Sequence, residues 1–428
     1  MSGRSPARPA LAIPTGSWSP PKQVTEPPMP RLVQALALGL VGAAVLGTTS
    51  RSAESSAMPA APPAILPGPG GSSLEPLGFD EIPGWAADDH AAAYSTFLRT
   101  CRGVAERGAV LRPGTPAPGA LVAVCRQALA EGEKGSSAAR AFFENRFTAY
   151  RVRPASGEGF LTGYYEPEME GSLVPTQAFA VPVLAKPDDL VSFPQGGVPG
   201  LDPALAAARK AGDVLEPYPD RAAIWNGALS GRGLELLYVR DEVELFLAQV
   251  QGSARVRLSD GSIRRLVYAG RNGRPYTSIG KVIVSEGHMT LDEMSLEKLK
   301  AWLRANPADA RRIMRLNQSY VFFAFGEGMD PGAGPIGAAS VPLTPLRSIA
   351  VDRTLWSYGL PFWIDADLTS ATGKPFAQLM IAQDTGSAIL GAARADIFFG
   401  SGAAAGTQAG LVRHAGRFVV LLPREGAP

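Results

Sequence analysis

Residues 382–400 read AQDTGSAILGAARADIFFG, and this stretch decides which fold and which kind of site we expect. Two apolar, strand-like segments flank a turn of small residues. Asp384 ends the first segment and Asp396 crosses the second. Acidic residues are depleted in strands, and a carboxyl group beside Ile-Phe-Phe is costly to bury. The two aspartates therefore need an explanation.

Two explanations stay open from these residues alone. In the structural one, Asp384 caps the turn that follows it, while Asp396 pairs with Arg394 or faces solvent. In the functional one, these aspartates and Asp352 in IAVDR serve the cleavage of a glycosidic bond, because such cleavage needs a proton for the leaving oxygen.

Composition favours a β-rich globular protein with several domains. The chain has 428 residues, of which 46% are hydrophobic and 19% charged, enough for two or three domains. Its 48 glycines and 38 prolines favour short strands and turns over helical bundles. A net charge of +2 without a long basic run argues against nucleic acid as a partner and suits a weakly charged polymer such as a glycan.

Sequence motifs for other chemistries do not occur. None of the 3 histidines lies in a zinc-protease motif, and there is no G-x-S-x-G elbow, so neither a metal nor a serine nucleophile is expected. The GAGPIG stretch at 332–337 contains Pro335 and precedes a strand-like segment, where a nucleotide loop would need a helix. We expect no cofactor.

The N-terminal part is expected to direct export. Arg31 precedes an apolar run over 32–49 and then small residues, which is typical of a secretory signal; an uncleaved anchor is the alternative. We assign 1–51 to this signal or anchor, and a start at Met29 would make 1–28 an extension. Because no cysteine follows the apolar run, we expect a periplasmic protein that is not a lipoprotein.

A tether and a helical lead-in are predicted next. Residues 52–80 are rich in Pro, Gly and Ser and are predicted to be disordered, with folded structure beginning near Ile82. Helical periodicity marks the lead-in over 81–167, whose third helical segment is SAARAFFENRFTAYRV. Cys101 and Cys125 lie in its other two helix-like stretches. Export permits a disulfide between them, and two buried thiols are the alternative.

Alternating strand-like pieces predict an inserted β domain over 168–330. Strands are expected at FAVPVLAK, GLELLYV, ELFLAQVQGSARVRL, IRRLVYAG and KVIVSEG. A helical unit, SLEKLKAWLRANPADARRIMRL, should begin with Ser295 as its N-cap. Residues 331–428 contain further strand-like pieces with Gly and Pro joints, typical of a compact β-barrel. The expected fold class is mainly β with a helical lead-in.

The order of four motif groups resembles the membrane-bound lytic murein transglycosylase A family. The groups are GFLTGYYEPEMEGS, QVQGSARVRLSDG with YAGRNGRPYTSIGK, ANPADARRIMRLNQSYVFF, and AQDTGSAILGAARADIFFG. The resemblance runs from about residue 80 to residue 423, and Ser348 to Phe399 also resembles a small barrel module named for three aspartates. It implies a double-psi β-barrel domain, with a second β-barrel domain inserted after GYYEP and a groove between the two.

The resemblance also implies site residues. Asp396 corresponds to the single catalytic acid of the family, and Asp384 to an aspartate that supports it. Packing between domains is the alternative role for the other motifs. One departure is Ala254, since QGSA replaces the more usual QGSG. The residues expected to bind substrate are Asp352, Thr162, Tyr164, Tyr165, Glu166, Gln251, Gly252, Ser253, Ser319 and Tyr320.

Members of the family resembled here cleave the β-1,4 bond between MurNAc and GlcNAc without water and leave a 1,6-anhydromuramoyl end. The implied partner is therefore a peptidoglycan glycan strand. We expect a monomer, and the sequence leaves open whether it has partners in a wall-synthesis complex. Family members are commonly lipoproteins, unlike the expectation for this chain. Two other readings stay open: an inverting hydrolase on a related barrel, and a wall-binding protein without catalysis.

Overall fold

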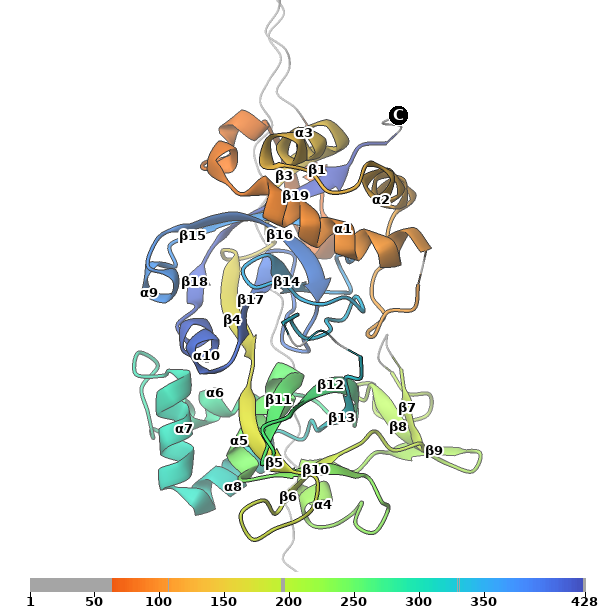
Figure 1. The fold of residues 1–428 in the computed structure, drawn as a ribbon, viewed down its shortest axis with the longest axis vertical. Helices are drawn as coiled ribbons and strands as arrows, with labels where there is room; N and C mark the ends of the chain where they lie inside the picture. The colour runs from red at the N-terminus through yellow and green to blue at the C-terminus, as the bar shows by residue number, and fades with distance from the viewer. Residues whose placement is uncertain (1–63, 107, 194–196, 329, 331, 426–428) are drawn as a thin grey trace, which may run out of the picture. The chain divides into compact units, whose positions relative to one another are not determined.

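The computed structural model describes residues 64–106, 108–193, 197–328, 330 and 332–425 (Figure 1). The predicted signal or anchor over 1–51 and the first part of the predicted tether lie outside these residues. Within the described part, strands form sheets of ten, six and three strands, with helices packed against them. The fold is therefore mixed α/β with more strand than helix, rather than mainly β. Closure of the sheets into barrels stays a prediction.

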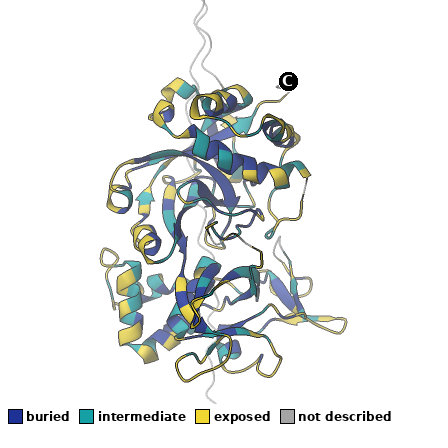
Figure 2. Ribbon diagram, in the orientation of Figure 1, coloured by how far each residue is buried: buried dark blue, intermediate teal, exposed yellow. Residues whose placement is uncertain are grey.

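The ten-stranded sheet contains both aspartates of the opening stretch. Its central strands are buried along almost their whole length, as expected for strands covered on both faces (Figure 2). In spatial order the strands are β1 (Leu66–Pro67), β2 (Ser73–Leu77), β3 (Phe147–Arg153), β19 (Arg417–Pro423), β15 (Pro361–Ala366), β16 (Phe376–Asp384), β14 (Ser348–Val351), β17 (Arg394–Ser401), β4 (Phe160–Glu166) and β18 (Arg413–Ala415).

The other two sheets lie in sequence between β4 and β14. The chain leaves the ten-stranded sheet at the end of β4 and enters the six-stranded sheet after Pro167 (Figure 1). The six strands, in spatial order, are β13 (Val321–Phe325), β12 (Ile263–Arg271), β11 (Ser253–Leu258), β5 (Glu168–Ser172), β10 (Glu235–Val239) and β6 (Val181–Leu184). The three-stranded sheet contains β7 (Leu190–Ser192), β8 (Ala207–Ala211) and β9 (Val214–Pro217).

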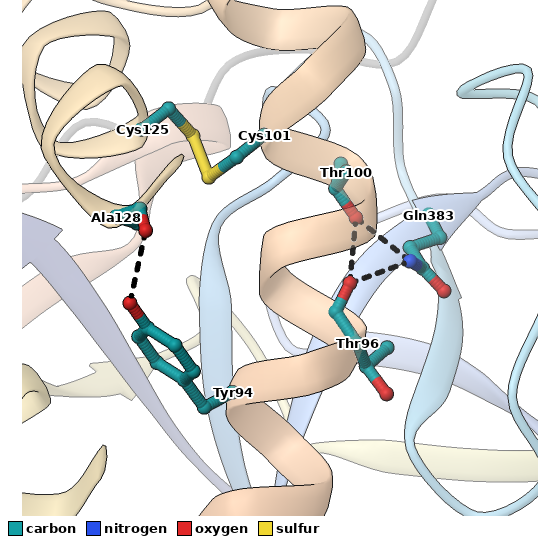
Figure 3. The surroundings of a disulfide bond; sticks show 7 residues. All are labelled: Tyr94, Thr96, Thr100, Cys101, Cys125, Ala128 and Gln383. Carbon is teal, nitrogen blue, oxygen red and sulfur yellow. Dashed lines mark hydrogen bonds between the residues drawn. A yellow bond between two sulfur atoms is a disulfide. The ribbon is translucent and has the colours of Figure 1, made fainter. Parts of the chain in front are cut away.

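Three helices of the lead-in pack on the ten-stranded sheet and share its core. They are α1 (His90–Glu106), α2 (Gly119–Glu131) and α3 (Ser136–Arg146). Figure 3 shows how α1 is held to β16: Gln383 Nε2 donates to the carbonyl of Thr96 at 3.1 Å and to Thr100 Oγ1 at 2.7 Å. Since Gln383 directly precedes Asp384, the helices help to fix the end of the strand that presents this aspartate.

The two cysteines, for which the sequence left two states open, form a disulfide. Cys101 of α1 and Cys125 of α2 are bonded, are both completely buried and lie 24 residues apart (Figure 3). We predict that replacing both by alanine lowers the free energy of unfolding by about 2–4 kcal/mol, because the cross-link restricts the unfolded chain. Urea unfolding measures this change. A reducing agent should destabilise the wild type similarly and leave the double variant unchanged; equal stability of both proteins under oxidising conditions would contradict the prediction.

Two predicted strand segments form helices instead. The segment 244–258 splits into α5 (Glu242–Gln251) and β11, and 281–287 belongs mostly to α6 (Ile279–Ser285). Asp241 and Ser278 cap these helices, each accepting a hydrogen bond from a backbone N–H of the first turn. The apolar side chains of α5 and α6 pack with α7 (Leu296–Ala305) and α8 (Pro307–Leu316), so tertiary packing outweighs their β propensity.

Two boundaries of the lead-in also need correction. The tether predicted over 52–80 is wrong for its second half, because β2 pairs antiparallel with β3 and Leu74 is buried in the core. The third predicted helical segment, in turn, stops at Arg146, and its end, FTAYRVR, is the strand β3. Each segment is short and only its partner strand makes it regular, so neither shows a clear period in sequence.

The helical unit that the sequence predicts from Ser295 forms α7 and α8, and the other remaining helices are short. Ser295 caps α7 as predicted, with its hydroxyl accepting from the N–H of Lys298. None of the helices in the described ranges is both long and apolar enough to cross a bilayer. The short helices are α4 (Arg221–Trp225), α9 (Thr369–Thr372) and α10 (Ala403–Gly410), together with the 3-10 turns η1 (Pro69–Gly71), η2 (Phe79–Glu81) and η3 (Trp85–Ala87).

Candidate active site

The register of the ten-stranded sheet places Asp384 and Asp396 on either side of Ala350. Ala350 of β14 pairs with Asp384 of β16 in one ladder and with Asp396 of β17 in the other. Asp396 in turn pairs with Thr162 of β4. Residues directly opposite each other in a ladder share a face of the sheet. The two aspartates lie two strand spacings apart, roughly 10 Å between Cα atoms, and the small Ala350 side chain separates them.

Asp396 is half-buried and accepts a hydrogen bond from Thr162 Oγ1 to Oδ1 at 2.6 Å. Arg394 Nη2 donates to the same hydroxyl at 2.7 Å instead of to the carboxylate. Among the described residues Asp396 forms no ion pair, so the structural explanation by an Arg394 pair is wrong. Burial raises the pKa of Asp396, and the charge of Asp384 raises it further, whereas Arg394 and the Thr162 bond oppose this rise. The net effect favours a carboxyl that keeps its proton.

Asp384 is held by three donors. Tyr164 OH donates to Oδ2 at 3.0 Å, and the backbone N–H groups of Ala338 and Thr385 donate to Oδ1 at 2.9 Å each. The bond to Thr385 is the turn cap expected from the sequence. The bonds from Tyr164 and Ala338 are tertiary and fix the carboxylate in one orientation.

Tyr164 is hydrogen-bonded to Asp384 and lies close enough to Asp396 to be affected by its charge. Burial raises the pKa of its hydroxyl well above the usual value, and the charges of Asp384 and Asp396 raise it further, so the group remains a donor. Its ring packs on Phe398, with 5.3 Å between ring centroids. Tyr164, Phe398 and Ala350 belong to one small apolar cluster, and the strand register places them beside Asp396. The cluster supplies the low-polarity surroundings that burial of Asp396 requires.

A small pocket beside Asp384 is lined by the residues of the QGS motif. Gln251, Gly252 and Ser253 line it together with Tyr164 and Asp384. Their role in substrate binding stays a prediction. Its free volume of about 10 Å³ holds one water at most. Gly252 ends α5 with φ 85°, a left-handed conformation that glycine adopts without strain.

Four predicted substrate-binding residues serve the fold in this structure instead. Asp352 is buried and accepts bonds from Thr354 and from the N–H of Gly391, so it ties two loops together. Ser319 and Tyr320 are buried in the insert, where Arg221 Nη2 donates to the carbonyl of Ser319 at 2.5 Å. Tyr165 is buried in the core of the ten-stranded sheet, and only its N–H reaches Gln251 Oε1, at 3.1 Å.

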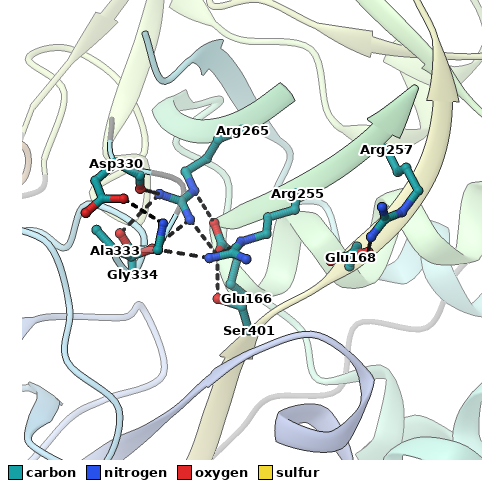
Figure 4. Close-up of polar contacts among 10 residues, drawn as sticks. Glu166, Glu168, Arg255, Arg257, Arg265, Asp330, Ala333, Gly334 and Ser401 are labelled. Carbon is teal, nitrogen blue, oxygen red and sulfur yellow. Dashed lines mark hydrogen bonds and ion pairs between the residues drawn. The ribbon is translucent and has the colours of Figure 1, made fainter. Parts of the chain in front are cut away.

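Glu166 differs most from its predicted role in substrate binding. The side chain is completely buried and meets two cations, with Oε2 2.9 Å from Arg255 Nε and Oε1 3.0 Å from Arg265 Nε (Figure 4). Ser401 Oγ donates to Oε2 at 2.6 Å. Both arginines also donate to the carbonyl of Ala333. Glu166 therefore joins the end of β4 to the six-stranded sheet and contacts no open surface.

Two further residues near the aspartates, Arg112 and Tyr276, come from segments that were not among the predicted site residues. Arg112, in the connection between α1 and α2, lines the pocket with Tyr268 of β12. Tyr276, in the turn after β12, lies close enough for the charge of Asp396 to raise its pKa, although burial is the larger cause. Tyr276 falls in the NGRPY part of a motif that carried the resemblance, so a signal existed for it; nothing local marked Arg112.

The comparisons with known proteins identify the class and then the family. The MltA specific insert domain matches residues 160–324, and the 3D domain matches residues 347–422. Membrane-bound lytic murein transglycosylase A of Vibrio cholerae is 33% identical over 279 residues, which cover 64% of this chain and 67% of that protein.

Solved structures of lytic transglycosylases are also similar to this chain. A membrane-bound lytic murein transglycosylase from Agrobacterium tumefaciens is 37% identical with a TM-score of 0.75, covering 83% of this chain and 98% of that one. MltA of E. coli with bound chitohexaose is 25% identical with a TM-score of 0.57, covering 78% of this chain and 90% of that one. The fold is that of an enzyme of the lytic transglycosylase class. The chain belongs to the membrane-bound lytic murein transglycosylase A family, which confirms the resemblance.

Proposed function

We propose that this protein cleaves the β-1,4 bond between MurNAc and GlcNAc in peptidoglycan and leaves a 1,6-anhydromuramoyl end. The observation that carries the proposal is Asp396, a half-buried carboxyl that forms no ion pair within the described part of the chain and whose pKa is raised by burial. Binding of chitohexaose by the E. coli relative supports a glycan strand as the substrate. We place the enzyme in the periplasm, because it would meet its substrate there.

In the first step, Asp396 acts as the general acid. Its proton passes to O4 of the departing GlcNAc as the bond from C1 of MurNAc to that oxygen breaks. Thr162 holds the carboxyl through Oδ1. A raised pKa keeps the proton on this carboxyl to a higher pH than on an ordinary aspartate.

In the second step, the same residue acts as the base. The Asp396 carboxylate takes the proton of the MurNAc C6 hydroxyl while that oxygen bonds to C1 of the same ring. An intramolecular nucleophile gains from proximity and replaces water. No second carboxylate is needed as nucleophile or base, and Asp384, with three donors on its oxygens, serves to position the site and to keep Asp396 protonated.

The mass of the products from purified sacculi tests the reaction. Anhydro ends are one water lighter than the reducing ends that an inverting hydrolase would leave, so mass spectrometry of the released fragments separates the two. Reducing ends alone would refute the proposal. Binding to sacculi without release of any fragment would instead identify a wall-binding protein.

The charge of Asp384 should set the alkaline limit of activity. That charge raises the pKa of Asp396, so Asp384→Asn is expected to lower this pKa. The acid then loses its proton at lower pH, and the falling limb of kcat against pH should move toward acid. Measuring fragment release from pH 4 to 9 checks this. A limb that stays in place would show that Asp384 acts through geometry alone.

A further inference from the structure

Two arginines from distant segments meet the loop that follows Asp384. Arg112 Nη1 donates to the carbonyl of Thr385 at 2.8 Å, and Arg271 Nη1 donates to Ser387 Oγ at 3.1 Å. Arg112 comes from the connection between α1 and α2, and Arg271 is the last residue of β12. Both guanidinium groups are thus bonded to the short loop that directly follows Asp384.

Arg112 is fixed in place but uses little of its donor capacity. Its Cζ lies 3.8 Å from the centroid of the Tyr268 ring, and the side chain lines the pocket that Asp384 and Tyr164 also line. The Nε–H of Arg112 is buried and has no hydrogen-bond partner among the residues that the structure describes. A guanidinium carries five N–H donors, so several remain for a ligand.

The charges that act on Arg271 are cationic, although Asp384 lines the same pocket as Arg112. Burial lowers the pKa of Arg271, and the charges of Arg112 and Arg353 lower it further, while only Tyr268 acts in the opposite direction. In the described part of the chain, neither Arg112 nor Arg271 forms an ion pair with an acidic residue. Arg112 and Arg271 are half-buried, and a cation taken partly out of water is stabilised by a partner of opposite charge, as the two arginines around Glu166 are. An anion is therefore the ligand this position suits.

We propose that Arg112 and Arg271 bind a free carboxylate of the peptide stem on the glycan substrate. The proposal rests on the proposed function and adds to it the part of the substrate recognised. The sugar backbone of peptidoglycan carries no charge of its own, whereas its peptide stems carry carboxylates. The planar fork of a guanidinium matches a carboxylate through paired hydrogen bonds. Placed next to the Asp384 loop, the pair would hold the stem beside the scissile bond.

Binding to an inactive enzyme tests this without relying on turnover. In the Asp396→Asn protein, calorimetry would compare soluble stem-bearing glycan fragments with the same fragments after their carboxylates are converted to amides. We expect about tenfold tighter binding of the free acids, the effect of about one charge-assisted hydrogen bond. Adding Arg271→Gln should bring the ratio of affinities close to one. Arg112→Gln, whose packing on Tyr268 also changes, is the second variant.

Arg264→Gln is the matched control. Arg264 lies on β12 as well, is exposed, and loses the same charge, so the tenfold preference should persist in it. Equal affinity of the Asp396→Asn protein for both ligands, or no binding of either, would overturn the proposal. A preference that survives in both arginine variants would also overturn it and leave the pair a packing role. The proposed function fails separately, if the wild type releases no anhydro fragments from sacculi.

Discussion

Asp396→Asn is expected to reduce the release of anhydromuropeptides from sacculi by about 10³-fold or more, because general acid and base catalysis each contribute about 10²–10⁴ and one residue supplies both. An amide of nearly the same shape keeps the Thr162 contact, so the fold should remain. Fragment release by chromatography and mass spectrometry measures the loss. Activity within a few-fold of the wild type would exclude Asp396 as the catalytic residue.

The same variant should gain stability at neutral pH. The pKa of Asp396 is raised in the folded protein, so its ionisation opposes folding as pH rises from the unfolded value, about 3.9, through the folded one. Asparagine removes that loss, and the difference in Tm between variant and wild type should grow from pH 4 to pH 8. Asp365→Asn is the control for both measurements, since Asp365 lies on β15 of the same sheet and pairs with exposed Arg417. It should leave activity unchanged.

Glu166→Ala is expected to cost about 3–5 kcal/mol in the free energy of unfolding, the range for removing one partner of a buried ion pair. Glu166 is completely buried, and its loss leaves Arg255 and Arg265 without their shared carboxylate (Figure 4). Ser401 loses its acceptor as well. Urea unfolding followed by circular dichroism measures the change.

Glu168→Ala is the matched control two residues away. Glu168 pairs with Arg257 at the surface, where both side chains reach solvent (Figure 4). Such pairs contribute about 0–1 kcal/mol. Similar losses for the two variants would show that burial of the Glu166 cluster has no energetic weight, contrary to the argument from the structure.

Local patterns predicted some parts of the fold and not others. Ser295 marked the start of α7 because a cap is a local hydrogen bond. The segment over α5 reads as a strand by composition and is nevertheless a helix, because its apolar face packs against α6, α7 and α8. Strand β2 follows Pro- and Gly-rich residues, and only pairing with β3 makes it regular.

Local patterns likewise indicated some residues of the candidate site and not others. Asp384 and Asp396 were recognisable because carboxyl groups in apolar strands contradict local preference, and such conflicts concentrate at functional sites. Of the residues predicted from TGYYEP, Thr162 and Tyr164 contact the two aspartates, whereas Tyr165 and Glu166 are buried away from them. Successive strand residues point to opposite faces, which explains why Tyr165 points into the core. Glu166 shares the face of Thr162 and Tyr164 but ends β4, where Arg255 and Arg265 of the six-stranded sheet bind its carboxylate.

The sequence alone determined the family, the two aspartates and the order of the segments, because motif chemistry and spacing are local properties of the chain. Tertiary structure decided which motif residues reach the carboxyl groups and which are buried as anchors. It also brought Arg112 and Arg271 to one loop. These outcomes depend on strand register and on contacts between residues more than a hundred positions apart, and no local pattern records them.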